Sequence, residues 1–199
     1  MLAIAYLGFL VLSWKHATLR NTLLSLTALI GAFFAFPLSN KSEPEVLRAK
    51  YVTALTRYNN VSYYWGGESP IGIDCSGLIR RGLIDSFFIH GICTFDSRLV
   101  RSALNLWWHD CTARDLGEGN GLTTHILDAP SINEVDHSRL LPGDLAVTNS
   151  GVHILAYLGN QEWIQADPGT NKVIILKVPS KENTWFQTKI NLVRWNSLL

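Results

Sequence analysis

The stretch from Tyr63 to Leu78, YYWGGESPIGIDCSGL, constrains the fold more than any other part of this chain. An aromatic patch and a Gly-Gly pair precede a single cysteine, Cys75, and an apolar run over residues 76–88 follows it. Apolar residues recur in this run at intervals of four, beginning at Ile79, which predicts a helix with one buried face. The chain is therefore expected to turn at the glycines and to enter a core helix at the cysteine.

The residue before the cysteine, Asp74, stands at the position of a helix N-cap, where a carboxylate accepts hydrogen bonds from the first turn. Cys75 would then begin the helix, and the unpaired N–H groups and positive dipole end found there favour thiolate over thiol. An isolated cysteine is more often a small buried apolar residue. A nucleophilic role for Cys75 therefore requires a base elsewhere in the chain.

Among six histidines, His153 is the strongest candidate for that base. It opens the strand-like run GVHILAYLG directly after an Asn-Ser-Gly turn, where a rigid scaffold would hold its ring. The remaining histidines lie in expected loops, helix ends or the N-terminal region and are interpreted as surface residues: His16, His90, His109, His125 and His137.

A polar residue on the next predicted strand is expected to orient the His153 ring. Gln165 lies 12 residues on, across a short hairpin turn, and its side-chain oxygen can accept from one ring N–H and fix the tautomer. Asp167, two residues further and on the same strand face, is the alternative. A neutral glutamine would stabilise an imidazolium less than a carboxylate would.

The first 40 residues are unusually apolar. Met1–Trp14 carries no charge, Lys15 and Arg20 follow, and Asn21–Asn40 is again uncharged over 20 residues. At about 1.5 Å per residue, the second run is long enough to cross a hydrocarbon core of about 30 Å. Residues 1–40 are therefore expected to form a membrane anchor of one or two hydrophobic helices, with a cleaved signal peptide or a buried helix pair as the alternatives.

The basic residues ahead of the second run predict the orientation of the chain. Short loops rich in Lys and Arg face the cytoplasm, so the part after residue 40 is expected on the extracytoplasmic side, either periplasmic or toward the cell wall. Residues 41–199 are expected to form one domain with its own core.

Composition excludes two classes of function. The formal net charge of +1 and the lack of a basic stripe give no case for a nucleic-acid partner. No Cys-x-x-Cys or His-x-x-x-His occurs, so neither a metal nor another cofactor is expected. If the domain lies outside the cytoplasm, Cys93 and Cys111 can pair and leave Cys75 free; the alternative is that both are unpaired core residues.

Helical patterns dominate the first half of the domain. Ser42 is a predicted N-cap, with Glu45 reaching back, for a helix that runs to about Tyr58. Asp96-Ser97 opens another helix, which is expected to place these residues on one side: Leu99, Ala103, Leu106 and Trp107. Residues 121–140 are interpreted as an extended loop.

Short β-type runs follow from residue 142 onward, separated by turn-like breaks. The strand candidates are residues 144–148, 152–158, 162–167, 172–178 and 189–195. Helices followed by an antiparallel meander predict an α+β architecture with a sheet of about five strands.

Four motifs in this order resemble the NlpC family of cell-wall cysteine peptidases. They are Tyr-Tyr-Trp-Gly-Gly from Tyr63, Asp-Cys-Ser-Gly from Asp74, Leu-Pro-Gly-Asp-Leu from Leu141, and His153 four residues before Tyr-Leu-Gly. The resemblance covers roughly residues 45–195. It implies a papain-like fold and cleavage of peptidoglycan stem peptides, typically between D-Glu and the diamino acid. The order cysteine then histidine argues against the permuted acyltransferase-like relatives.

The resemblance also implies a role for each matching residue. Cys75 would be the nucleophile, His153 the base and Gln165 the orienting third member, with Tyr63 near the oxyanion. Three residues would line the substrate-binding end, where the amine of the stem peptide is held: Trp65, Asp74 and Ser76. The alternatives are aromatic core packing for Tyr63 and Trp65, and a plain helix cap for Asp74.

Two features depart from the family pattern. The third position is usually His but is Gln165 here, and the spacing from Cys75 to His153 is longer than usual. The extra residues form an insertion around 95–130 that carries Trp107-Trp108, for which a cap over the cleft, altered specificity or a partner site are the open roles.

Three functional hypotheses follow. The first is a membrane-anchored peptidase acting on stem peptides through a thioester intermediate. The second is an amidase, acyltransferase or thioesterase acting on lipid-linked or protein acyl groups. The third is a non-catalytic, membrane-bound interaction module.

Overall fold

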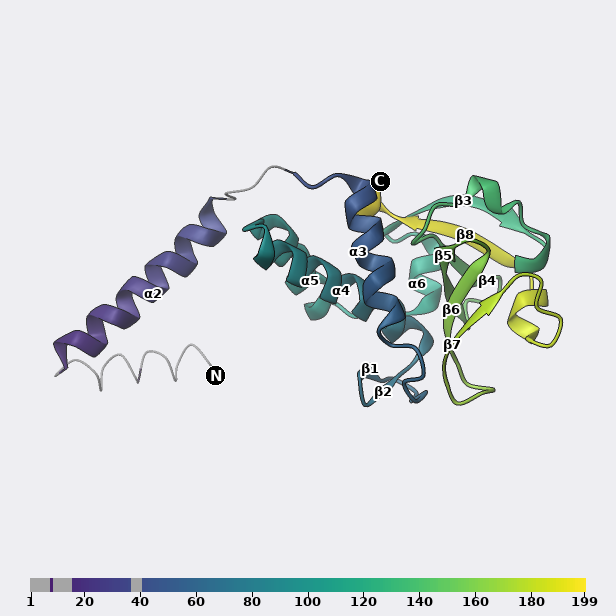
Figure 1. The fold of residues 1–199 in the computed structure, drawn as a ribbon, viewed down its shortest axis with the longest axis horizontal. Helices are drawn as coiled ribbons and strands as arrows, with labels where there is room; N and C mark the ends of the chain where they lie inside the picture. Colours follow the sequence, from purple (N-terminus) through teal and green to yellow (C-terminus); the bar gives the residue numbers. More distant parts are fainter. Residues whose placement is uncertain (1–7, 9–15, 37–40) are drawn as a thin grey trace.

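A computed structural model describes residue 8, residues 16–36 and residues 41–199. Most of the first apolar run, and the end of the second, lie outside the described residues. Helix α2 (Ala17–Ala35) stands apart from the body of the molecule and buries none of its residues (Figure 1). Its mean hydropathy of 1.3 over 19 residues makes it, among the described helices, the one long and apolar enough to cross a membrane.

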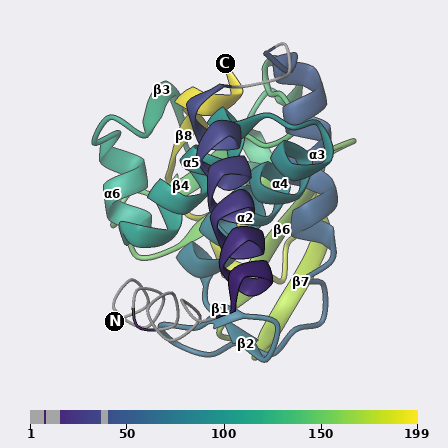
Figure 2. The same ribbon diagram turned by 90° about the vertical axis from the view of Figure 1, so that its left-hand side faces the viewer.

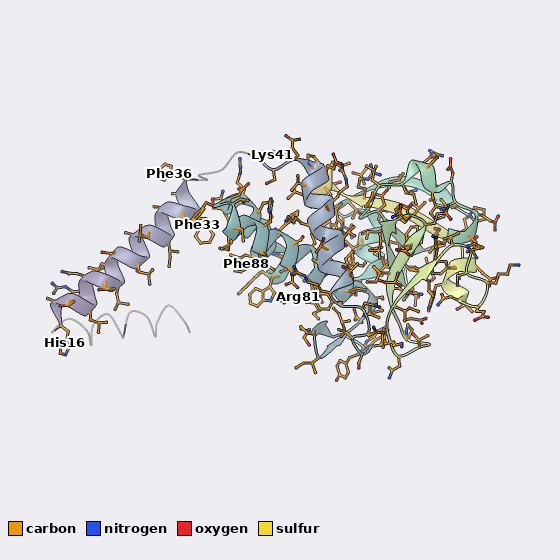
Figure 3. All side chains as sticks on the ribbon, viewed as in Figure 1. His16, Phe33, Phe36, Lys41, Arg81 and Phe88 are labelled. Atoms are coloured by element: carbon orange, nitrogen blue, oxygen red, sulfur yellow. The ribbon has the colours of Figure 1, made fainter. Side chains whose placement is uncertain are left out.

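Helix α2 contacts the body near its C-terminal end. The Arg101 guanidinium on α5 donates to the carbonyl of Phe34 at 2.6 Å. Phe33 lies beside the same end of the α4–α5 pair in Figure 3.

Four helices precede or flank the sheet: α3 (Pro44–Thr56), α4 (Cys75–Cys93), α5 (Ser97–Trp108) and α6 (Ala113–Glu118). The expected helix at the cysteine is present and begins at Cys75 itself. The prediction that Ser42 caps α3 was wrong. Glu43 is the N-cap and makes no side-chain hydrogen bond to the helix. The Ser42 hydroxyl lies 3.1 Å from His90 Nε2 on α4. That tertiary contact removes the hydroxyl from the helix end.

Helix α5 begins after its predicted N-cap, Asp96, whose carboxylate accepts from the Arg98 N–H. Ala103 and Leu106 are buried, as the spacing predicted, but Trp107 is 56% exposed. The spacing placed Trp107 on the same side as these two residues, so the buried face of α5 is narrower than expected.

The sheet has six antiparallel strands in the order β3-β8-β4-β5-β6-β7. Their bounds are β3 Thr123–Ala129, β4 Leu145–Thr148, β5 Ile154–Gly159, β6 Glu162–Asp167, β7 Lys172–Lys177 and β8 Ile190–Trp195. β4 to β7 form the expected meander, and β8 returns to pair with β4 on its other side. A separate two-stranded ribbon, β1 (Glu68–Ser69) and β2 (Gly72–Ile73), precedes α4.

Strand β3 corrects the expectation of a loop over residues 121–140. It pairs with β8 at the sheet edge, with Thr123 opposite Trp195, and the register shifts between His125 and Leu127. Its sequence, TTHILDA, does not alternate cleanly in polarity because most of its side chains stay partly exposed. The edge strand adds one to the expected five.

The helices cover one face of the sheet, as Figures 1 and 2 show from two directions. Alternate side chains of β4 separate two cores: Leu145 and Val147 join the helices, and Ala146 faces the opposite side with Trp163 and Phe186. Cys75 belongs to the helix-side core. The fold therefore places the start of α4 against the sheet, on the face that the helices cover.

Candidate active site

Asp74 joins the start of α4 to the Gly-Gly loop. Its Oδ1 accepts from the Gly77 N–H at 2.7 Å and from the Ser76 hydroxyl at 3.1 Å. Its Oδ2 accepts from the Gly66 N–H at 2.8 Å. The predicted N-cap is therefore confirmed, and the same carboxylate also fixes the loop that precedes Cys75.

The glycines of this stretch allow two segments of backbone to approach closely. A Cβ on Gly77 would lie 2.3 Å from the Gly67 carbonyl oxygen, and a Cβ on Gly67 would lie 2.5 Å from that of Gly72. Real side chains do not tolerate such distances. The Gly-Gly pair and the glycine two residues after Cys75 therefore bring the loop, the β1–β2 ribbon and α4 together.

His153 lies one residue before β5 and is buried. Its backbone N–H donates to Thr148 Oγ1 at 3.0 Å, and its Nε2 lies 2.6 Å from Gln165 Oε1. With the amide oxygen facing the ring, Nε2 carries the proton and Nδ1 is left as the acceptor. The Trp185 ring stacks on a face of the His153 ring, with the two centroids 4.1 Å apart.

Asp167 does not bond the His153 ring. Its carboxylate accepts from the Gly169 N–H at 2.8 Å, from Asn183 Nδ2 at 2.9 Å and from Trp185 Nε1 at 3.4 Å. The hydrogen bond to the ring therefore comes from Gln165, while Asp167 holds the indole that stacks on it. Trp185 was not predicted, because it lies in the short 3₁₀ segment Thr184–Gln187 and no local pattern links it to the histidine.

The cysteine faces the backbone on both sides of His153. Cys75 Sγ lies 3.9 Å from the Val152 carbonyl oxygen, and the Ile154 N–H interacts with the same sulfur. Residues 77 positions apart in sequence are thus brought together, because the start of α4 packs against the turn between β4 and β5.

Burial controls the charge state of both groups. It raises the pKa of the Cys75 thiol to about 11, with the Asp74 charge adding to it and backbone N–H groups opposing it. It lowers the pKa of His153 to about 4, against the effects of Gln165 and Asp167. Burial therefore opposes the thiolate that was expected at the helix start, and at neutral pH it favours a thiol and a neutral imidazole.

Tyr63 is partly buried and close to this pair. Burial, together with the charges of Cys75 and Asp74, raises the pKa of its phenol to about 12. Its backbone pairs with Ile73 in an isolated bridge, and its N–H donates to the Asn171 carbonyl at 2.9 Å. The hydroxyl therefore remains a proton donor at neutral pH.

A cavity of about 840 Å³ opens in front of Cys75. The helix start contributes Asp74, Cys75 and Ser76, and the turn before β5 contributes Gly151 and Val152. The insertion supplies the opposite wall, including Trp107, Trp108, Asp110 and Arg114. Trp65 also lines the cavity at 78% exposure, so it is not a core residue.

Buried Arg80 holds the insertion against α4. Its Nη1 donates to Glu68 and, at 2.6 Å, to Asp110 Oδ1. Its Nη2 donates to the carbonyls of Leu106 at 2.8 Å and His109 at 3.0 Å. These bonds satisfy carbonyls at the C-terminal end of α5 and fix the Trp107–Trp108 segment between them. Arg80 carries no sequence signal, since it looks like one arginine of a helical Arg-Arg pair.

The cysteines do not form a disulfide. Cys75, Cys93 and Cys111 are all free thiols, with Cys93 exposed and Cys111 buried. The Cys93–Cys111 disulfide, which the sequence left open, is not formed. Across the described residues, no three His, Cys, Asp or Glu side chains are grouped to hold a metal ion.

A family model matches most of this chain. The NlpC/P60 family model matches residues 60–194. "Dipeptidyl-peptidase 6" from Lysinibacillus sphaericus is 27% identical over 132 residues, which span 66% of this chain and 36% of that protein. The chain thus corresponds to about a third of that relative.

The solved structures similar to this chain include two from different organisms. NlpC2 from Trichomonas vaginalis is 17% identical, with 80% of this chain and 50% of that one covered and a TM-score of 0.49. The peptidoglycan hydrolase RipB from Mycobacterium tuberculosis is 18% identical, with 82% and 70% covered and a TM-score of 0.48. The family match spans the Gly-Gly loop, Cys75, His153 and Gln165 in a single continuous segment. The chain therefore belongs to the NlpC/P60 family.

Proposed function

We propose that this protein is a cysteine peptidase that hydrolyses peptidoglycan stem peptides through a thioester intermediate. The observation that carries the proposal is the packing of Cys75 against the residues on both sides of His153, whose ring Gln165 holds by a hydrogen bond of 2.6 Å. A thiol, a base with one free acceptor nitrogen and an orienting group are the three parts that nucleophilic catalysis by cysteine requires.

The neutral resting pair determines how the first step proceeds. As Cys75 Sγ attacks the substrate carbonyl carbon, His153 Nδ1 takes the thiol proton, and the carbonyl π electrons move onto oxygen. The Cys75 N–H and the Tyr63 hydroxyl donate to that oxyanion. The imidazolium then protonates the leaving amine, the C–N bond breaks and a thioester remains.

Hydrolysis of the thioester reverses these roles. His153 takes a proton from water as the water oxygen attacks the thioester carbonyl. The C–S bond breaks, and the proton returns to the Cys75 sulfur. The products are an amine and a carboxylic acid, and the enzyme regains its thiol and neutral imidazole.

The substrate assignment follows from the family and from the helix start. The relatives include a protein named dipeptidyl-peptidase 6 and a structure named as a peptidoglycan hydrolase. The bond between D-Glu and the diamino acid is the expected target. Asp74 and Ser76 line the cavity beside Cys75, where a carboxylate and a hydroxyl suit the amine of a stem peptide.

We place the catalytic body at the extracytoplasmic membrane surface. Helix α2 is the candidate span, and the end of the α4–α5 pair that contacts it exposes three large apolar residues: Phe88, Ile92 and Phe95. Phe88 is labelled on α4 in Figure 3. These side chains suit the apolar boundary of a bilayer.

The test uses the full chain purified in detergent, with peptidoglycan fragments of defined stem peptide as substrate. Wild type should release products whose masses place the cut after D-Glu, while Cys75→Ala and His153→Ala should lower turnover at least a thousandfold. Cys93→Ala is the matched control, because Cys93 is an exposed free thiol outside the cavity. Turnover retained by Cys75→Ala would refute the mechanism.

A second candidate substrate is a lipid-linked or protein-bound acyl group. The observation in its favour is the exposed aromatic rim of the cavity, formed by Trp65, Trp107 and Trp108. Mass spectrometry of products from acyl-lipid and cell-wall substrates, assayed side by side, separates this candidate from the peptidase.

A further inference from the structure

Five charged side chains line the cavity in front of Cys75, and three of them form one ion-pair network. Buried Arg80 pairs with both Glu68 and Asp110, which leaves one net negative charge on the three. The other two, Asp74 and Arg114, have no partner of opposite charge within 4 Å among the described residues. Asp74 accepts from backbone N–H groups and a hydroxyl, which are neutral donors. Arg114 is therefore the cavity's one cation outside an ion pair, among the described residues.

Arg114 is exposed and contacts the turn before His153 without being neutralised. It lies on α6, and a Cβ added to Gly151 would come within 2.9 to 3.1 Å of its Cβ, Cγ and Nε atoms, so the side chain runs along the backbone of that glycine. Its Nη2 donates to the Ser150 carbonyl at 3.3 Å. Its neighbour in the chain, Asp115, is already engaged by Thr112 in the capping box of α6.

This position adjoins the backbone segment that faces Cys75. Gly151 precedes Val152, whose carbonyl oxygen is 3.9 Å from Cys75 Sγ, and both residues line the cavity together with Arg114. Gly151 has a φ of +69°, which glycine adopts readily, and its missing side chain leaves the room that Arg114 occupies. Arg114 thus places an exposed cation beside the turn that precedes His153.

We propose that Arg114 binds a free carboxylate on the residue that contributes the scissile carbonyl. The proposal rests on the proposed function. Glutamate has two carboxyl groups apart from its amine, so when one forms the bond that Cys75 attacks, the other remains free and charged. A guanidinium is the side chain whose fork of N–H donors matches a carboxylate. Asp74 then binds the amine and Arg114 binds the free carboxylate of the same substrate.

The experiment compares two synthetic stem peptides that differ only in this group: a free carboxylate on D-Glu, or the corresponding amide. Wild type should cleave the acid with a kcat/KM about tenfold or more above that of the amide, as expected for a charge-assisted hydrogen bond. Arg114→Gln should lower kcat/KM for the acid to the level of the amide and leave the amide almost unchanged. Arg114→Lys should keep part of the preference.

Two controls separate this role from a structural one. Arg139→Gln removes an exposed arginine that does not line the cavity and should leave the preference intact. Circular dichroism of Arg114→Gln should match wild type. An equal loss of kcat/KM for both peptides in Arg114→Gln, or no preference in wild type, overturns the proposal.

Binding to the Cys75→Ala protein, measured by calorimetry, makes the inference independent of turnover. Arg114→Gln in that background should weaken binding of the acid and not of the amide. Arg114-dependent discrimination without cleavage by wild type would defeat the proposed function and keep the carboxylate site. Cleavage without discrimination between acid and amide in either assay would support the proposed function and overturn the carboxylate site.

Discussion

At the scale of single residues, the site is organised by what surrounds the His153 ring. Gln165 binds one nitrogen, Trp185 covers a face, and burial keeps the imidazole neutral. Cys75 is kept as a thiol by the same desolvation. Burial disfavours the charged form of each group. In the proposed reaction, proton transfer between them is therefore coupled to the arrival of a substrate whose carbonyl accepts the electron pair.

Alkylation of Cys75 by iodoacetamide tests this charge state. Because the thiol pKa is raised to about 11, thiolate is scarce at pH 7 and the rate in wild type should climb mainly through the alkaline range. Gln165→Glu should increase the rate at pH 7 severalfold, since a carboxylate beside Nε2 stabilises imidazolium and thereby the ion pair. Gln187→Glu, at an exposed position, is the control. A wild-type rate that is already maximal near pH 6 would contradict the neutral pair.

At the scale of elements, the site depends on close contacts between α4 and two neighbouring segments. The glycines at 67 and 77 let the preceding loop touch the first turn of α4, and Arg80 fastens the end of α5 to the middle of that helix. The insertion thus becomes a wall of the cavity through a buried arginine rather than through apolar packing alone.

Gly77→Ala tests the first of these contacts. The new methyl group would meet the Gly67 carbonyl, and overpacking of this kind costs about 1–3 kcal/mol of unfolding free energy. Turnover should fall by more than stability predicts, because relief requires the loop that carries Tyr63 to move. Gly31→Ala on α2, which has open space around it, should change neither quantity. Urea unfolding and kcat/KM measure the two effects. Wild-type values of both for Gly77→Ala would contradict the close contact between residue 77 and the Gly67 carbonyl.

At the scale of the whole molecule, the fold brings together residues from its two halves. The proposed nucleophile comes from the helical part. The proposed base and its partner come from the meander β4–β7, where His153 immediately precedes β5 and Gln165 lies on the adjacent β6. Helix α2 lies outside this body and touches it at α5. The proposed anchoring and the proposed catalysis can therefore be tested separately.

Leu26→Arg in α2 tests the anchor. An arginine at the centre of a spanning helix costs about 2.5–3.5 kcal/mol of insertion free energy, so the share of protein retained in membranes after carbonate extraction should fall. Cleavage of a soluble stem peptide should be unchanged. Leu199→Arg, an equal change at an exposed position of the body, should leave retention at the wild-type level. If Leu26→Arg were retained in membranes as well as wild type, the proposal that α2 is the anchor would be refuted.

Local features were predictable from the sequence alone. The helix at Cys75, the Asp74 cap and the strands of the meander follow from spacing and turn residues within a few positions of each other. The hydrogen bond between His153 and Gln165 was also among the two pairings that a short hairpin allows. Such features depend on interactions along a single element, which the order of residues determines.

The tertiary structure decided what depends on distant neighbours. Trp185 on the histidine ring, Arg80 under the insertion and Arg114 beside Gly151 all involve contacts across at least 26 positions of the chain. The protonation of Cys75 also depends on distant neighbours. The helix start favours thiolate locally, but burial against the sheet removes water and raises the pKa of the thiol. Desolvation is a property of the whole packed core, and no segment of sequence encodes it by itself.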